Sequence, residues 1–179
     1  NLTILRHAVD LVRRERGIEI DLDRIPLDDA ATFELLASGE TTGIFQLESA
    51  GMRRYIRELR PTSVYDLAAM VALYRPGPMD NIPAYIRRKH GQEKVTYLHP
   101  LLEPYLDKTY GIFVYQEDIM AAAIALGGFT GPEADTLGYA IRKKKSSVLR
   151  AQKEKFVTQA AERGVPAHTI DAVFTAFEP

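Results

Sequence analysis

The sequence contains no cysteine among its 179 residues. Disulfide bonds and thiolate metal sites are therefore excluded, and redox chemistry does not constrain the compartment. No apolar run approaches the roughly 20 residues that a membrane-spanning helix needs. The segment 1–11 mixes charged and apolar residues and lacks the apolar stretch of a signal peptide. We therefore expect a cytoplasmic localisation and no membrane partner.

A strong net charge is also missing, because 23 basic and 24 acidic residues leave a formal charge of -1. The chain as a whole is therefore not a polyelectrolyte binder. The charges are unevenly placed, with acids prevailing in 19–40 and bases in 142–155. Such asymmetry can mark an anion-binding surface, or it can be a solvated helix face. The basic segment contains Arg142, Lys143, Lys144, Lys145, Arg150, Lys153 and Lys155 against the single Glu154.

Strand signals are few and short, and the dominant period of the apolar residues is helical. With 46% hydrophobic residues the chain can form one packed domain. We predict an all-α fold with at most a minor short β element, at 112–114. The segment 64–74 is apolar nearly all round, which predicts a buried central helix. The other predicted helices cover 2–16, 30–38, 46–59, 82–90, 100–107, 116–126, 131–143, 146–163 and 167–177.

Capping residues set several of these boundaries. Gly17, Gly39 and Gly91 are expected to end helices, because glycine tolerates the left-handed conformation of a C-terminal cap. Thr130 with Glu133 resembles a capping box, which fixes the start of the helix that follows. Other expected N-terminal caps are Asp28 or Asp29, Ser63 and Asp80, and Ser146 or Ser147 is expected to start the long basic helix.

Two acidic pairs, Asp21 with Asp23 and Asp28 with Asp29, resemble the paired carboxylates of two-metal chemistry. The competing interpretation is structural, because both pairs lie in a turn-like region beside Pro26 and suit helix caps. The four histidines have no metal-ligand spacing. The sequence also lacks a Walker-type phosphate loop, a dinucleotide fingerprint and a Ser/His/Asp order. From the residues alone, turns and caps are favoured over a metal site for the acidic pairs, and no catalytic set is indicated.

The segment 74–79, Tyr-Arg-Pro-Gly-Pro-Met, is the most distinctive loop. Two prolines fix φ and remove N–H donors, so the preceding helix must end there. The rigid backbone would hold Arg75 in a fixed place for binding. Alternatively, the loop is a plain helix terminator, and Arg75 caps the carbonyl groups of that helix.

The segment 131–147 is the strongest candidate for binding chemistry. On a helical wheel the apolar residues fall on one side, and Asp135, Tyr139, Arg142 and Lys143 fall on the other. Lys144 swings back toward the apolar side, which predicts that the helix ends near Lys143. The last turn would thus present cations and one aromatic ring. Cations at a helix C-terminus also complement the helix dipole, which is the structural alternative.

Several segments, in order and spacing, resemble the alpha subunit of bacterial DNA polymerase III, a C-family replicative polymerase. Each segment alone is weak evidence, but together they run along nearly the whole chain. The resemblance places the chain in the fingers domain, with 1–45 as a palm-proximal part and 46–179 as helical fingers with basic C-terminal helices. The segments are 25–29 (IPLDD), 43–52 (GIFQLESAGM), 72–78 (ALYRPGP), 87–91 (RRKHG), 109–117 (TYGIFVYQE) and 133–135 (EAD).

The resemblance implies which functions belong to this chain and which belong to other parts of the polymerase. In the family the metal-binding aspartates sit in the palm, just upstream of the point where residue 1 aligns, so Mg²⁺ belongs to the palm of the parent enzyme. The acidic pairs of this chain are then turns and caps, and no cofactor is bound by this chain alone. The expected partners are primer–template DNA, the incoming deoxynucleotide, the palm and thumb domains and, through other domains, replisome subunits such as the sliding clamp. We expect an excised domain that is inactive by itself.

In the family the fingers close over the incoming deoxynucleotide, and basic side chains on the helix after the Ala-Asp pair reach its triphosphate. The usual pattern there is Leu-Arg-Arg-Ala-(Met/Ile)-Gly-Lys-Lys, whereas 137–144 reads Leu-Gly-Tyr-Ala-Ile-Arg-Lys-Lys. Arg142 and Lys143 lie one helical turn, about 6 Å, beyond the two replaced arginines. We predict nucleotide contacts from Arg142, Lys143, Lys144, Tyr139 and Arg75. We predict DNA contacts from Lys145, Arg150, Lys153, Arg87 and Arg88.

A second function class fits the same residues: a stand-alone helical module that binds nucleic acid or protein without a polymerase role. The missing initiator Met and the missing tail favour a polymerase fragment over that module. Salt-dependent binding of primer–template DNA would separate direct DNA contact from its absence.

Overall fold

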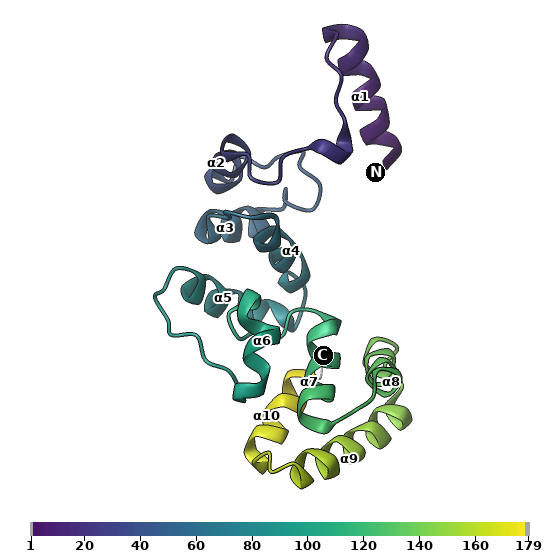
Figure 1. Ribbon diagram of the computed structural model, residues 1–179. Coiled ribbons are helices and arrows are strands. Elements are labelled where there is room, and N and C mark those ends of the chain that lie inside the picture. The colour runs from purple at the N-terminus through teal and green to yellow at the C-terminus, as the bar shows by residue number, and fades with distance from the viewer. Residues whose placement is uncertain (1, 178–179) are drawn as a thin grey trace.

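The computed structural model describes residues 2–177, and Figure 1 shows their arrangement. All regular structure in this range is helical, and no strand occurs in it, so the predicted all-α class is confirmed. The α-helices are α1 (Leu2–Arg16), α2 (Ala30–Ser38), α3 (Ala50–Leu59), α4 (Val64–Leu73), α5 (Ile82–Lys89), α6 (Glu103–Leu106), α7 (Gln116–Gly127), α8 (Gly131–Arg142), α9 (Ser146–Glu162) and α10 (Ala167–Phe177). Short 3-10 turns cover Leu22–Arg24, Pro78–Asn81, Pro100–Leu102 and Asp107–Thr109.

Helix α1 stands apart from the other helices, as Figure 1 shows. It ends where predicted, at Gly17, whose φ of 66° is in the left-handed region. None of its described residues is buried, and Leu2 and Leu5 on its apolar face are exposed. Val9 and Val12 on the same face are partly covered, so the apolar face of this helix is half exposed within residues 2–177. None of the described helices is long and apolar enough to cross a membrane.

The remaining helices pack around two hydrophobic clusters. Apolar side chains of α2 to α5, joined by two residues before α7, form the N-terminal cluster. The C-terminal cluster is built from α6 to α10 and is centred on Phe156, whose ring meets those of Phe129 and Phe174 at centroid distances of 6.1 and 6.0 Å. Burying aromatic rings in this way contributes strongly to stability, because each removes a large apolar area from water.

Three predicted caps are present with their expected hydrogen bonds. The Asp29 carboxylate accepts from the Thr32 N–H at 2.8 Å and begins α2. Ser63 and Asp66 form a reciprocal capping box at the start of α4. Another box begins α8, where the Thr130 N–H donates to Glu133 at 2.9 Å. These bonds satisfy N–H groups that have no partner inside the helix.

Three local predictions are wrong, each because neighbouring structure overrides the sequence signal. Helix α3 begins at residue 50 and not 46, because Gln46 has a φ of 64° and cannot be helical. Asp80 does not cap α5, because the 3-10 turn Pro78–Asn81 leads directly into that helix. Helix α4 is only half buried, since Tyr65 and Ala68 face away from the core. Helix α9 begins at Ser146, as predicted, and its N-cap residue is Lys145.

The segment 112–114 carries no strand pairing in the described chain, and its residues Ile112 and Val114 instead pack into the N-terminal cluster. Helix α2 contacts α3, and Leu36 of α2 belongs to the same cluster. The predicted domain boundary after residue 45 stays a prediction.

Candidate functional site

Tyr74 and Arg75, which are consecutive residues after α4, have side chains with different surroundings. The Tyr74 ring packs edge-on against Tyr55, with centroids 6.1 Å apart, and its hydroxyl lies over the Cα of Gly51. Gly77 takes a φ of 90°, and the Met79 N–H closes the turn onto the Arg75 carbonyl at 3.1 Å. The loop is therefore tightly bonded, and Arg75 leaves it on the side that faces α7 and α8.

The end of α8 has the geometry of a Schellman cap. The Lys145 N–H donates to the Ala140 carbonyl at 2.9 Å, and the Lys144 N–H donates to Ile141 at 3.1 Å. Lys144 sits at the left-handed position of this cap with a φ of 50°. Glycine is the usual residue there, and a side chain in this conformation costs about 1 kcal/mol. The cap turns the Lys144 side chain back toward the body of the domain, as the helical wheel indicated.

These two features meet around one cavity, which we call the α4–α8 cavity. Its volume is about 530 Å³. Arg75, Arg142 and Lys144 line it, and no acidic residue does so among the residues that the structure describes. Apolar residues form the rest of the wall together with Tyr115, Gln116 and Gly138. The apolar lining consists of Ala72, Pro76, Pro78, Phe113, Val114, Ile119, Ile141 and Ala176.

The cations of the cavity differ in their bonding. The Arg142 guanidinium donates from Nη1 to Oε1 of Gln116 at 3.2 Å and lies 6.0 Å from the centre of the Tyr139 ring. Within residues 2–177, Arg75 and Lys144 have no side-chain hydrogen bond or ion pair. Their charges are therefore available to an anionic ligand.

Burial tunes the aromatic and acidic groups beside the cavity. Desolvation, reinforced by the nearby Asp118 charge, raises the pKa of Tyr115, so its phenol keeps its proton at neutral pH and can donate a hydrogen bond. Burial also raises the pKa of Asp118, although the N–H groups of Val114 and Tyr115 donate to its carboxylate at 2.9 and 2.8 Å. Asp118 thus fixes the start of α7, where Gln116 is located.

The structure brings three of the five predicted nucleotide-contact residues together: Arg75, Arg142 and Lys144. Tyr139 and Lys143 are exposed beside the cavity without lining it. Sequence reasoning did not single out Gln116 as a site residue. Only a long-range contact reveals it, because Gln116 and Arg142 are 26 residues apart.

The predicted DNA-contact residues fall into two places. Lys145 immediately precedes α9, and Arg150 and Lys153 lie in the first half of that helix. The Lys153 ammonium lies 4.7 Å from the centre of the Phe174 ring, which anchors it to the C-terminal cluster. Arg87 and Arg88 lie instead on α5, beside the N-terminal cluster (Figure 1).

On α5, both predicted arginines bind the same carboxylate. Arg87 and Arg88 each meet Glu93 at 2.8 Å, and these hydrogen bonds, with that of Arg88 the larger, hold the pKa of Glu93 below its ordinary value. Arg88 also donates to the Tyr110 carbonyl at 2.9 Å, and its side chain is only 16% exposed. These contacts give Arg88 a structural role, whereas its binding to DNA stays a prediction.

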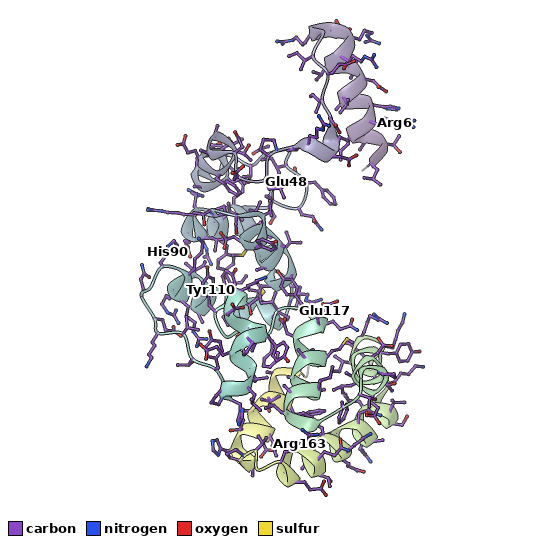
Figure 2. The ribbon with its side chains drawn as sticks, viewed as in Figure 1. Arg6, Glu48, His90, Tyr110, Glu117 and Arg163 are labelled. Atoms are coloured by element: carbon purple, nitrogen blue, oxygen red, sulfur yellow. The ribbon has the colours of Figure 1, made fainter. Side chains whose placement is uncertain are left out.

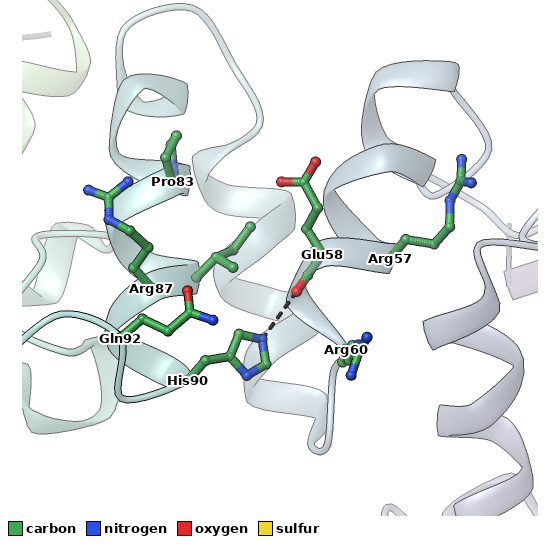
Figure 3. Close-up of a pocket in the computed structure, with 8 residues that line it drawn as sticks. Arg57, Glu58, Arg60, Pro83, Arg87, His90 and Gln92 are labelled. Carbon is green, nitrogen blue, oxygen red and sulfur yellow. Dashed lines mark hydrogen bonds between the residues drawn. The ribbon is translucent and has the colours of Figure 1, made fainter.

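A second cavity, of about 780 Å³, opens between the ends of α3 and α5 (Figure 3), and we call it the α3–α5 cavity. Figure 3 shows His90 reaching across to the Glu58 carbonyl, at 3.1 Å from Nε2. The lining of this cavity includes an acidic residue, Glu58. Among the described residues, the α4–α8 cavity has no acidic lining residue. The other lining residues are Arg57, Arg60, Pro83, Ile86, Arg87 and Gln92.

One residue of each acidic pair near the N-terminus, Asp21 and Asp29, caps a turn or helix, as predicted. Asp21 accepts from the Asp23 N–H at 3.0 Å and begins the 3-10 turn Leu22–Arg24. Hydrogen bonds from Thr32, first from its hydroxyl and then from its N–H, lower the pKa of Asp29. The described residues contain no group of three or more His, Cys, Asp or Glu that could hold a metal ion. The two-metal carboxylate set of a polymerase therefore does not fit the residues of this part of the chain.

Comparison with known proteins agrees with this geometry. Residues 1–164 match the family described as the bacterial DNA polymerase III alpha subunit finger domain. The chain is 52% identical over 97% of its length to the DNA polymerase III subunit alpha of Halalkalibacterium halodurans, and 49% identical over 99% to that of Thermus aquaticus. The Staphylococcus aureus subunit is 47% identical over 92% of the chain.

The chain belongs to the family of bacterial DNA polymerase III alpha subunit finger domains. It covers 16% of the Halalkalibacterium relative and 15% of the other two, so it spans about a sixth of their length. The resemblance inferred from the short segments of sequence is thereby confirmed.

Proposed function

We propose that this chain serves as the fingers of a bacterial replicative DNA polymerase, and that its α4–α8 cavity contacts the triphosphate of the incoming deoxynucleotide. The carrying observation is the convergence of Arg75, Arg142 and Lys144 on one cavity that has no acidic lining residue. These residues come from segments more than 60 positions apart, so the fold and not the sequence run brings them together.

A triphosphate needs such a site for two reasons. Its charge must be neutralised so that the attacking primer end can approach, and its reacting phosphorus must be held in line. A guanidinium offers paired N–H donors that match phosphate oxygens, and an ammonium adds a point charge. The apolar wall lowers the local dielectric, which strengthens both interactions.

The three cations have different structural support. Arg75 is held by a bonded turn, Arg142 by Gln116, and Lys144 by the Schellman cap. Tyr139 and Lys143 flank the opening, and in this proposal they contact parts of the ligand that extend beyond the cavity. The sugar and base would extend in that direction when the phosphates occupy the cavity.

The basic side chains of α9 would contact the primer–template. Lys145 and Arg150 are exposed, and Lys145 follows the cavity residue Lys144 directly in the chain. Contacts from such cations to backbone phosphates give affinity that falls with salt, by a slope of about -0.9 for each phosphate neutralised in duplex DNA. Lys153 supplies a third charge on the same helix.

The rest of the activity belongs to the parent polypeptide. In this proposal its palm holds Mg²⁺ and the catalytic aspartates, its thumb and other domains hold DNA and the sliding clamp, and the protein works in the cytoplasm. The metal supplies charge neutralisation and water or hydroxyl activation when bound. Residues of the present chain orient the nucleotide, so the isolated chain has no polymerase activity.

Replacement of Arg142 by alanine in the full-length polymerase tests the proposal. Loss of one charge-assisted contact should raise the nucleotide KM about 10- to 100-fold. Arg57→Ala is a matched control, because Arg57 lines the α3–α5 cavity and has no predicted role in binding, so this variant should leave the nucleotide KM unchanged. An unchanged nucleotide KM in Arg142→Ala would remove the cavity from nucleotide binding.

A further inference from the structure

The side chain of Gln116 occupies the space beside the Cα of Gly138 where a side chain would lie. A Cβ built on Gly138 would lie 2.7 Å from Nε2 of Gln116 and 3.3 Å from its Cδ and Cγ. The first distance is far inside van der Waals contact, so any side chain at 138 would have to displace the end of Gln116. The missing side chain on α8 therefore makes room for a side chain from α7.

The other end of the same amide holds the arginine of the cavity. Oε1 of Gln116 accepts from Nη1 of Arg142 at 3.2 Å, while Nε2 faces Gly138. Arg142 has no acceptor of its own, so the oxygen of the amide is the atom that must face it. All three residues line the α4–α8 cavity.

Gln116 is itself held in place. It is the first residue of α7, and the Asp118 carboxylate binds the two N–H groups that precede it, those of Val114 and Tyr115. A glutamine anchored in this way restricts the directions that the long Arg142 side chain can take. Restricting a flexible side chain before the ligand arrives reduces the entropy lost on binding.

The sequence of 137–144 places the glycine and the arginine of this arrangement on the same face of α8. Within the segment 137–144, position 138 is glycine, and the arginine stands four positions further on, at 142. Four residues of an α-helix rise about 6 Å, so Arg142 lies about one turn beyond Gly138 on the same face. The space freed at 138 is the space that Gln116 occupies.

From these contacts we infer that Gln116 is a positioning residue that orients Arg142 toward the nucleotide phosphates, and that Gly138 is required for it. The inference rests on the proposed function, because Arg142 is the group that binds. Gln116, Gly138 and Arg142 then act as one unit, and changes at the three positions are not additive.

A set of single and double variants of the full-length polymerase tests this unit through steady-state kinetics. Gln116→Met keeps the volume of the side chain and removes the acceptor, so the nucleotide KM should rise about three- to tenfold with a smaller change in kcat. In the Arg142→Ala background the same change should alter KM by less than about twofold.

Gly138→Ala gives an independent readout. It should raise the nucleotide KM about threefold when Gln116 is present and have no effect on KM in a Gln116→Ala background, where the space is vacant. A purely structural role predicts the opposite pattern, because alanine favours a helix over glycine and would stabilise α8 without changing KM.

The outcomes distinguish a failure of the positioning role of Gln116 from a failure of the proposed function. If Arg142→Ala raises KM and Gln116→Met does not, or if their effects multiply, the positioning role is overturned and the proposed function stands. If Arg142→Ala leaves KM unchanged, both are overturned. Non-additive effects at all three positions support the unit.

Discussion

The two cavities of this domain both carry arginine, but they leave its charge in different states. In the α3–α5 cavity Arg87 is bound to Glu93, and Glu58 adds a carboxylate to the lining. In the α4–α8 cavity Arg75 and Lys144 have no ion pair within residues 2–177, and no acidic residue lines the wall there. Figure 2 shows how far apart the two regions lie, with His90 beside the first and Glu117 near the second.

A basic residue in the sequence therefore indicates an anion-binding site only when the structure shows that no carboxylate already binds its charge. The sequence pattern gives Arg87, Arg88 and Arg142 equal weight as cations. Arg87 and Arg88 hold the chain segment that follows α5, through Glu93 and the Tyr110 carbonyl. Within residues 2–177, the charge of Arg142 meets a neutral amide and an aromatic ring and no carboxylate, so it remains available to an anion.

Charge reversal in each cavity should give the largest contrast. Arg142→Glu places a carboxylate against the proposed triphosphate position, so the nucleotide KM should rise more than about 100-fold in the full-length polymerase. Arg57→Glu in the α3–α5 cavity should leave that KM within about twofold. Steady-state kinetics with a single nucleotide checks both variants, and equal effects from the two would erase the distinction between the cavities.

Removing Arg88 should cost stability and leave nucleotide binding unaffected. Arg88→Leu leaves the Tyr110 carbonyl without this donor and frees one side of Glu93. The local opening free energy around α5 should fall by about 2 kcal/mol. Hydrogen exchange of the α5 amides measures this loss, with Arg142→Leu as the variant that should not change it. Full protection of α5 in Arg88→Leu would contradict the structural role.

Acid should loosen the attachment of α8 to α9. Hydrogen bonds from Lys155, and next from the Thr130 N–H, lower the pKa of Glu133 from its ordinary value of 4.5 to about 2. A carboxyl group whose pKa is lowered by folding contributes stability above its unfolded value. That contribution is lost as the pH falls from about 4.5 to about 2. Denaturant unfolding of the chain across this range should show the loss, and Glu133→Gln should abolish that part of the pH dependence.

Each cavity is lined by one residue that ends a helix with a positive φ, and replacing that residue by glycine should give the smallest effects. Arg60 and Lys144 both line a cavity with a positive φ, 46° and 50°. Arg60→Gly and Lys144→Gly should each relieve about 1 kcal/mol of backbone strain and raise the thermal midpoint. Only Lys144→Gly should raise the nucleotide KM, by about two- to fivefold. An equal rise in Arg60→Gly would mean that the α3–α5 cavity also contacts the nucleotide.

Much of the fold was predictable, because its helix ends are encoded locally. Asp29, Ser63 and Thr130 cap helices through bonds that span three residues, and Gly39 ends α2 in the left-handed conformation. The errors arose where packing decides. The turns of 41–47 are closed by the buried Thr41 hydroxyl on the Leu47 carbonyl at 2.6 Å, and this bond delays the start of α3.

The candidate site was predictable only in part, for a related reason. The positions of Arg142 and Lys144 follow from the periodicity of one helix and its end. The approach of Arg75 depends on how the loop after α4 packs against α7 and α8. Gln116 carries no charge and no local motif, so its bond to Arg142 becomes visible only when the two helices are in place.

A structure of the full-length polymerase with primer–template DNA and an incoming nucleotide is the most direct test of the central claim. The account predicts triphosphate oxygens within hydrogen-bond distance of the Arg142 guanidinium, with the Lys144 ammonium and the Arg75 guanidinium facing the same phosphates. A bound nucleotide whose phosphates lie away from the α4–α8 cavity, with these three side chains directed elsewhere, would contradict it.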